Sequence, residues 1–358
     1  MLVTPGRLPD QTFWRGKRVF LTGHTGFKGA WTALWLARLG ARVTGFARAP
    51  DTQPSLYELA RVDADLNSMI GDLQDRRSVE KAVTAADPEI VLHLAAQPLV
   101  RAAIADPIET MATNVMGTTH LLQALRSASS LTTVLVVTTD KVYSNANGDR
   151  AFTEDDRLGG KDPYSASKAA VELITASFRS SYFEHQNVRV ATARGGNVIG
   201  GGDFSYDRIV SDIVRSVMQN TELTLRMPEA TRPWQHVLDC IAGYLLYAEG
   251  LGSGMTLPPA LNFGPEPARA LTVGELAFHL LKALGKPASF DVRYDEASIE
   301  MSKLAIDASK SRDHLGWRDR VTGDRLIDWT ADWYSTVLSG TDARSVTLGQ
   351  IDAYCGMP

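Results

Sequence analysis

The chain has 358 residues, of which 44% are hydrophobic and 22% are charged, as in an ordinary folded globular protein. Its net charge is −4 at pH 7 and it has no basic run, which argues against nucleic acid as a partner. The two cysteines, Cys240 and Cys355, have no metal-ligand spacing around them, so we expect neither a disulfide framework nor a metal site. No signal-peptide pattern and no apolar stretch of the ~20 residues that cross a bilayer are present, so we expect a cytoplasmic protein without membrane contact.

After a loose arm over residues 1–16, the β-branched and aromatic run Arg18 to Thr22 predicts the first strand. Glycines at GxxGxxG spacing follow, and then the helix-forming segment Ala30 to Leu39. A strand, glycine turn and helix in this order are typical of a dinucleotide-binding loop, because glycines let the backbone amides and the helix N-terminus approach a diphosphate. The spacing alone says little, since a plain tight turn also shows it. The residues predicted to bind a cofactor here are Gly23, Thr25, Gly26, Phe27, Lys28 and Gly29.

The second predicted strand, Arg42 to Phe46, lacks the Asp or Glu that usually holds the ribose of NAD at its end. Ala47 and Arg48 occupy that region instead. An arginine there favours binding of a 2′-phosphate, so NADP remains an alternative to NAD as the cofactor. The other interpretation is that Arg48 is simply an exposed charge on a loop. The cofactor residues predicted after the third strand, over residues 67–70, are Asp72 and Leu73.

Further apolar runs alternate with helical segments. Strands are predicted over 89–94, 133–137 and 188–193, and helices over 78–85, 107–128 and 164–182. Strands that are apolar on both faces and alternate with helices indicate an α/β fold with a Rossmann-like, doubly wound parallel sheet. The alternation breaks down after residue 200, and later elements are predicted over 304–306 (strand), 309–315 and 325–338 (helices). We therefore expect an arm over 1–16, a cofactor domain over 17–196 to which a strand within 240–264 returns, and a smaller interleaved substrate lobe over 197–239 and 265–358.

Two predicted strands end in small or polar residues. The fourth runs into Ala95, Ala96 and Gln97, and the fifth runs into Thr139, Asp140 and Lys141. Doubly wound sheets bind ligands at these carboxyl ends. Thr139 would hydrogen-bond a substrate hydroxyl, Asp140 would be a general acid if a dry pocket keeps it protonated, and Lys141 would transfer a proton or stabilise an enolate. The alternative is a polar strand end that caps a turn.

Tyr164 and Lys168 are four residues apart on a predicted helix and so lie on one face. A free tyrosine has a pKa of about 10, so a catalytic phenolate needs help from a neighbouring cation such as Lys168. The alternative is an exposed pair at a helix start. Arg208 and Arg232 are candidate ligands for a diphosphate. The histidines His24, His93 and His236 form no metal pattern, and His236 is the best candidate among them for a polar contact with a ligand.

Taken together, eight segments resemble the extended short-chain dehydrogenase/reductase family and, within it, the CDP-glucose 4,6-dehydratases. They are GHTGFKG (Gly23 to Gly29), LHLAAQPLVR (Leu92 to Arg101), TNVMGT (Thr113 to Thr118), TTDKVYSN (Thr138 to Asn145), YSASKAAVE (Tyr164 to Glu172), GNVIGGGD (Gly196 to Asp203), RPWQHVLD (Arg232 to Asp239) and LNFGP (Leu261 to Pro265). Asp140-Lys141 resembles the CDP-sugar branch, since the related dTDP-glucose dehydratases carry Asp-Glu there. Phe204 and Ser211 stand where Trp and Pro are expected, which affects substrate fit rather than the reaction class.

The resemblance implies a dehydratase that converts CDP-glucose to CDP-4-keto-6-deoxyglucose with a tightly bound, recycled NAD. Tyr164, assisted by Lys168 and Thr139, would take the proton of the 4-hydroxyl, and Asp140 would protonate the departing 6-hydroxyl. The group that removes the carbon 5 proton is left open, because Lys141 must be neutral to act as a base. The resemblance also implies a homodimer or homotetramer and a role in deoxysugar synthesis for lipopolysaccharide O-antigen. It adds Ala95, Ala96, Gln97 and Asn114, with Tyr164 and Lys168, as cofactor residues, and Gln97, Arg101, Asn197, Arg208, Arg232, Gln235 and His236 as substrate residues.

Four other functions stay open. The chain could be a 4-epimerase, or a dehydratase for another nucleotide sugar, with the same fold. An epimerase needs no acid to expel water, so replacing Asp140 would spare it. A non-catalytic dinucleotide-binding regulator would bind cofactor without turnover, and an oxidoreductase acting on another alcohol would show net cofactor reduction.

Overall fold

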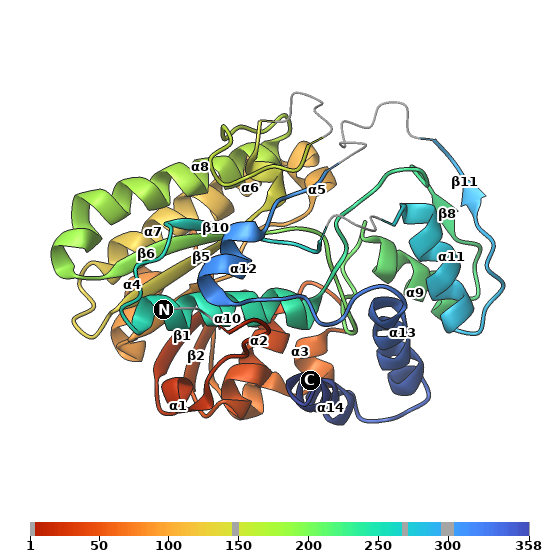
Figure 1. Ribbon diagram of the computed structural model, residues 1–358, viewed down its shortest axis with the longest axis horizontal. Coiled ribbons are helices and arrows are strands. Elements are labelled where there is room, and N and C mark those ends of the chain that lie inside the picture. Colours follow the sequence, from red (N-terminus) through yellow and green to blue (C-terminus); the bar gives the residue numbers. More distant parts are fainter. Residues whose placement is uncertain (1–3, 145–149, 267–270, 295–303, 358) are drawn as a thin grey trace.

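A seven-stranded parallel sheet forms the centre of the computed structural model (Figure 1), which describes residues 4–144, 150–266, 271–294 and 304–357. The first three residues of the predicted arm and Asn145 lie outside the described residues. The strand order is β10-β6-β5-β4-β1-β2-β3, so the winding reverses between β1 and β4, as in doubly wound folds. The predicted fold class is confirmed. The strands are β1 (Arg18–Thr22), β2 (Arg42–Ala47), β3 (Asn67–Ile70), β4 (Ile90–His93), β5 (Thr133–Thr139), β6 (Arg189–Gly195) and β10 (Ala260–Phe263).

Helices cover both faces of this sheet (Figure 1). On β1, Val19 and Leu21 belong to one hydrophobic cluster and Phe20 to the other, because successive side chains of a strand point to opposite faces. One face packs against α4 (Arg76–Ala86), α7 (Gly117–Leu125) and α8 (Pro163–Phe178), and the other against α2 (Phe27–Arg38) and α10 (Val237–Gly252). The predicted helix over 107–128 consists of α6 (Pro107–Met111), the π-helical turn η2 (Ala112–Met116) and α7.

The N-terminal arm is anchored, so the prediction of a loose arm is wrong for its described part. It contains the short helix α1 (Gln11–Trp14), and the Trp14 side chain is fully buried. Arg7 forms an ion pair with Glu249 of α10, and the Gly6 amide donates to the carbonyl of Gly316 at 2.8 Å. The arm therefore packs against segments that come much later in the chain.

A second group of elements lies to one side of the sheet (Figure 1). Helix α11 packs against both α9 and α13, and the short strands β8 and β11 pair beside them. These elements are α9 (Ile209–Gln219), β8 (Thr224–Leu225), α11 (Val273–Ala283), β11 (Asp291–Val292) and α13 (Asp324–Leu338). The remaining elements are α3 (Leu56–Leu59), η1 (Val62–Asp65), α5 (Val100–Ala105), η3 (Asp140–Val142), η4 (Arg179–Phe183), η5 (Glu184–Gln186), β7 (Val198–Ile199), β9 (Gln235–His236), α12 (Ser309–Leu315) and α14 (Ala343–Cys355).

The strand predicted over 304–306 is wrong. Ile306 forms only an isolated bridge with Phe152, whose backbone bonds to Ala305 and Asp307. Only one extended residue of the facing loop, Phe152, runs alongside this segment, and one residue is too few to form a strand pair. No helix in the described ranges is long and apolar enough to cross a membrane.

Candidate active site

The glycine loop between β1 and α2 is closely packed. Gly23 has a φ of +80°, which a side chain rarely tolerates, and a Cβ on Gly29 would lie 1.9 Å from the Gly23 carbonyl oxygen. Gly26 caps α2 without a side-chain hydrogen bond, and the first turn carries no acidic residue. The first amides of α2 are therefore not taken by a side chain, and this donor set fits the diphosphate of a dinucleotide.

Arg48, at the end of β2, lies among carboxylates. Its guanidinium is 3.2 Å from Glu109 and 3.4 Å from Asp51, and its carbonyl accepts a hydrogen bond from the Thr25 hydroxyl at 2.8 Å. Because these two carboxylates balance its charge, Arg48 is poorly suited to hold a 2′-phosphate.

Two residues predicted to bind cofactor brace the turn after β4 against α8. The Gln97 amide N–H donates to Asn114 Oδ1 at 2.8 Å, and Asn114 Nδ2 donates to the Ser167 hydroxyl at 2.9 Å. The Gln97 side chain is engaged by Leu99 and Thr110. Neither Gln97 nor Asn114 is among the described residues that line the cavity beyond the turn, whereas Ala96 is.

After β3, the Asp72 carboxylate accepts the Gln74 amide at 2.9 Å, and Leu73 is buried against Gly117. Ala95, at the end of β4, donates its amide N–H to the Thr22 hydroxyl at 3.2 Å and touches the Gly23 position. These three predicted cofactor residues therefore pack or form hydrogen bonds at the carboxyl ends of β3 and β4, near the glycine loop.

A cavity of about 590 Å³ lies between the carboxyl ends of β4 to β6 and the second group of elements. All five residues predicted to be catalytic line it, together with four of the seven predicted substrate residues. The nine are Thr139, Asp140, Lys141, Tyr164, Lys168, Arg101, Asn197, Arg208 and Arg232.

Helix α8 begins so that Tyr164 and Lys168 face this cavity. Asp162 is the N-cap and accepts the Ser165 amide at 2.9 Å, and Pro163 occupies the first helical position. Burial raises the pKa of Tyr164 to about 12, whereas a hydrogen bond with Thr139 and the charge of Arg208 act to lower it.

Lys168 donates to the Val137 carbonyl at 3.1 Å, and burial, followed by the charge of Lys28, lowers its pKa to about 7. Tyr164 and Lys168 both line the cavity. In the free protein, however, the groups that ease ionisation of Tyr164 most are Thr139 and Arg208.

A buried network fixes the orientation of α8. Glu172, one turn beyond Lys168, pairs with Arg194 of β6 at 2.8 Å and accepts hydrogen bonds from Thr192 and Thr138. Because these partners come from β5 and β6, the helix cannot rotate against the sheet without breaking buried, charge-assisted bonds.

Asp140 is only 2% exposed. Its Oδ1 accepts a hydrogen bond from the Thr139 hydroxyl at 3.0 Å, and its buried Oδ2 has no hydrogen-bond partner among the described residues. Burial raises the pKa of Asp140, while Lys141, the Thr139 bond, Arg232 and Lys28 lower it. A carboxyl group that stays protonated near neutral pH can act as a general acid.

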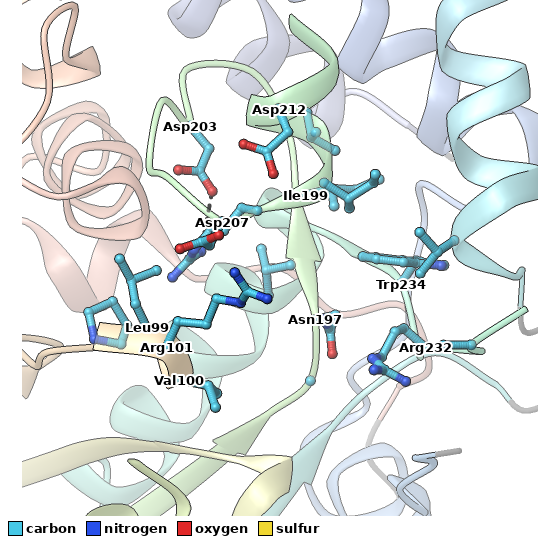
Figure 2. Close-up of a pocket in the computed structure, with 18 of the residues that line it drawn as sticks. Leu99, Val100, Arg101, Asn197, Ile199, Asp203, Asp207, Asp212, Arg232 and Trp234 are labelled. Atoms are coloured by element: carbon cyan, nitrogen blue, oxygen red, sulfur yellow. Dashed lines mark hydrogen bonds and ion pairs between the residues drawn. The ribbon is translucent and has the colours of Figure 1, made fainter. Parts of the chain in front are cut away.

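The far part of the cavity is polar. Figure 2 shows Arg101 and Arg232 entering it from opposite sides in this view, with Asn197 between them. Arg208 forms an ion pair with Asp203 at 3.2 Å. Guanidinium groups arranged in this way suit an anionic diphosphate.

The sequence did not predict the carboxylates and arginines that line the cavity from α9, from the end of β8 and from the loop before α9. Asp212 pairs with Arg215 at 2.7 Å, and Asp207 pairs with Arg226 at 3.0 Å. The spacing of Asp212 and Arg215 on a helix was the only local signal for them. All four line the cavity.

Gln235 and His236, predicted to contact substrate, are fully packed in the interior. His236 caps α10 through its Nδ1, which accepts the Leu238 amide at 3.2 Å, and burial lowers its pKa to about 3. Neither of them is among the described residues that line the cavity, although the Gln235 amide N–H donates to the carbonyl of Asn197, which does line it, at 2.9 Å. His93 is likewise internal, bonded to Thr22 and Thr118. No cluster of three or more potential metal ligands occurs in the ranges described.

A model of the family described as GDP-mannose 4,6 dehydratase matches residues 20–253. The chain belongs to the GDP-mannose 4,6 dehydratase family. A relative from Salmonella typhimurium, named CDP-glucose 4,6-dehydratase, is 41% identical over 351 residues, covering 96% of this chain and 98% of the relative. The dTDP-glucose 4,6-dehydratase of Xanthomonas campestris pv. campestris is 28% identical over 334 residues, covering 88% and 92%.

Solved structures give the fold of this dehydratase family member independently. A double mutant of dTDP-glucose 4,6-dehydratase from Streptomyces venezuelae, solved with NAD bound, matches with a TM-score of 0.76 at 24% identity, covering 88% of this chain and 96% of the other. The UDP-glucose 4-epimerase of Thermotoga maritima matches with a TM-score of 0.78 at 20% identity, covering 89% and 99%. Both likenesses concern the fold, which dehydratases and epimerases share.

Proposed function

We propose that the protein is a CDP-glucose 4,6-dehydratase that converts CDP-D-glucose to CDP-4-keto-6-deoxy-D-glucose and water with a retained NAD. The observation that carries this proposal is the buried, protonation-prone Asp140 in the same cavity as Tyr164 and Lys168. A 4-epimerase requires the tyrosine and lysine but has no use for an acid aimed at a leaving hydroxyl. The relative that is 41% identical over nearly the whole chain supports the choice of CDP-glucose.

The oxidation begins at Tyr164, which takes the proton of the sugar 4-hydroxyl while Thr139 orients that hydroxyl. When bound, NAD supplies the hydride acceptor for carbon 4 and the later hydride donor for carbon 6. The first amides of α2 would hold its diphosphate, Asp72 would lie toward its adenine ring, and Lys168 would hold a ribose. Arg101, Arg208 and Arg232 would hold the diphosphate of the sugar nucleotide.

The elimination follows from the acidity that the new 4-ketone gives to carbon 5. The carbon 5 proton moves to Lys141, the electron pair forms the bond between carbons 5 and 6, and the 6-hydroxyl leaves as water with the proton of Asp140. Lys141 lines the cavity beside Asp140 and is half-buried. It must be neutral when it accepts the proton.

Replacing Lys141 by methionine tests its part in this step. We expect deuterium from D₂O to enter carbon 5 roughly 100-fold more slowly than in the unaltered protein, the usual loss when a general base is removed. Proton nuclear magnetic resonance of the sugar checks this. Lys161→Met, at an exposed position before α8, is the matched control and should keep the normal rate. Normal exchange in the Lys141 variant would exclude Lys141 as the base.

The function itself is tested by mixing the purified protein with CDP-glucose, dTDP-glucose and GDP-mannose separately, without added cofactor, and measuring product mass. Loss of one water from CDP-glucose alone is the expected result. Unchanged mass for all three, with and without added NAD, would contradict the proposal. Chromatography of the sugars would then separate an epimerase from a binding protein.

The choice of NAD gives a further prediction. Because Glu109 and Asp51 balance the charge of Arg48, we expect NADH to bind at least about tenfold more tightly than NADPH, a difference of about 1.4 kcal/mol. Fluorescence titration of the cofactor-free protein measures the affinities for NADH and NADPH. Changing Glu109 to Gln and Asp51 to Asn together should narrow the preference, whereas equal affinities in the unaltered protein would refute this account of Arg48.

We also propose a homodimer or homotetramer, a cytoplasmic location and a role in deoxysugar synthesis for lipopolysaccharide O-antigen. What supports self-association is the apolar surface of neighbouring helices, where Ile108 of α6 is 80% exposed and Leu173 of α8 is 62% exposed. Leu173→Glu should lower the mass found by light scattering, while Leu338→Glu, on α13, should not. A monomer in the unaltered protein would refute this association.

A further inference from the structure

Lys28 occupies an unusual place for a lysine. It lies in the first turn of α2, where the helix dipole disfavours a cation, so helix stability does not account for it. Its side chain does not point to solvent but lines the cavity that holds Asp140 and Tyr164. The backbone of Lys28 thus belongs to the dinucleotide loop, while its ammonium belongs to the cavity.

Lys28 and Asp140 line the same cavity, and a run of contacts along its wall leads from one to the other. Lys28 Nζ lies 5.8 Å from the centre of the Tyr244 ring, and the Tyr244 hydroxyl abuts Gly195 at the end of β6. The next residue, Gly196, adjoins Asp140: a Cβ there would lie 3.3 Å from Oδ2. This is the buried carboxyl oxygen that has no hydrogen-bond partner among the described residues.

The charges of the two groups influence each other. Burial and, to a smaller extent, the charge of Arg208 lower the pKa of Lys28, whereas Cys240, Asp140 and Asp203 raise it. Lys28 in turn is one of the cations, after Lys141 and Arg232, that favour the ionised form of Asp140. Burial thus disfavours the ionised form of Asp140, and the nearby cations favour it.

We propose that Lys28 is a positioning residue for the elimination, which stabilises the carboxylate that Asp140 becomes when it gives its proton to the departing 6-hydroxyl. This inference rests on the proposed dehydratase function. In that step the Asp140 proton passes to the 6-oxygen, the bond between carbon 6 and oxygen breaks, and water leaves, so a negative charge remains on a buried carboxylate. When Lys28 is removed, one of the cations that favour the ionised form of Asp140 is lost, so Asp140 is a weaker acid and the elimination slows. The preceding oxidation does not use Asp140 and continues.

The test compares Lys28→Met, Lys28→Arg and the exposed control Lys81→Met on α4 with the unaltered protein. Each is saturated with NAD and mixed with CDP-glucose. Absorbance at 340 nm reports bound reduced cofactor, and quenching with borodeuteride followed by mass spectrometry separates the undehydrated 4-ketosugar from product. We expect Lys28→Met to lower kcat by roughly 10- to 100-fold, within the range for impaired general acids, and to accumulate the ketosugar and reduced cofactor. Lys28→Arg, which keeps the charge, should restore most of the rate, and Lys81→Met should change nothing.

A double variant gives the sharpest result. Because Lys28 acts through Asp140, Lys28→Met in an Asp140→Asn background should add less than about threefold to the loss caused by Asp140→Asn alone. The inference would be overturned if the fold-losses in rate of the two single variants multiplied in the double variant. It would also be overturned if a fluorescence titration showed that weaker NADH binding alone accounts for the loss in Lys28→Met. Lys28→Gln replaces the methionine variant if thermal denaturation shows that the latter is unfolded. Failure of the unaltered protein to dehydrate CDP-glucose would instead refute the proposed function.

Discussion

Tyr164→Phe should abolish the oxidation of CDP-glucose while leaving the fold and cofactor binding intact. The variant loses only the phenolic oxygen that takes the 4-hydroxyl proton, and the ring remains in its buried place at the start of α8. We expect the rate of reduced cofactor formation in a single turnover to fall by roughly 10²- to 10⁴-fold, the usual range for loss of a proton-transfer group. Stopped-flow absorbance at 340 nm measures it.

The matched control is Tyr182→Phe, which removes a hydroxyl from a partly exposed tyrosine after the same helix. It should oxidise CDP-glucose at the normal rate. If Tyr164→Phe retained more than about a tenth of that rate, the proton would have another acceptor and the role of Tyr164 would have to be withdrawn.

Gly29→Ala should have a comparably large effect through geometry alone. The new methyl group would lie 1.9 Å from the Gly23 carbonyl oxygen and 2.9 Å from His24 Cα, and both atoms are backbone. The loop between β1 and α2 must therefore move. We expect NADH affinity to fall at least about 100-fold, equivalent to about 2.7 kcal/mol, together with a lower melting temperature.

Gly349 provides the comparison for this prediction. It lies within α14, its φ is not in the left-handed region, and a Cβ there would meet no atom within 4 Å. Gly349→Ala should therefore leave NADH affinity unchanged and stabilise the protein slightly, by roughly 0.5–1 kcal/mol, since alanine is the better helix former. Fluorescence titration measures the NADH affinity of both variants, and thermal denaturation measures their stability. Normal NADH binding by Gly29→Ala would refute the claim that the loop between β1 and α2 needs glycine at this position.

The sheet was predictable because its strands are apolar on both faces and end in recognisable turns. The predicted strands over 18–22 and 67–70 coincide with β1 and β3, and the others differ by a residue or two. Helix α14 was not predicted, although Asp342 caps it and Gly356 follows it, because its apolar residues show only weak periodicity. The failed strand at 304–306 depended on a partner loop that no local pattern reveals.

The same distinction applies to the site. Thr139 and Asp140 could be predicted to lie near Tyr164 because the carboxyl ends of parallel strands meet at one edge of the sheet. The wall that carries Asp212 and Arg226 could not, since it depends on how α9 and β8 pack against the rest of the chain. His236 belongs to a segment typical of the family, but its buried position at the cap of α10 follows from packing between Trp31 and Trp329.

The anchored N-terminal arm has a consequence for synthesis on the ribosome. Gly6 and Arg7 bond to Gly316 and Glu249, which are translated long after them. At about 5–20 residues per second, the interval before Gly316 emerges is roughly 15–60 s. During that time the bonds of Gly6 and Arg7 to Gly316 cannot form. The closing of this long-range contact is thus among the last events of folding.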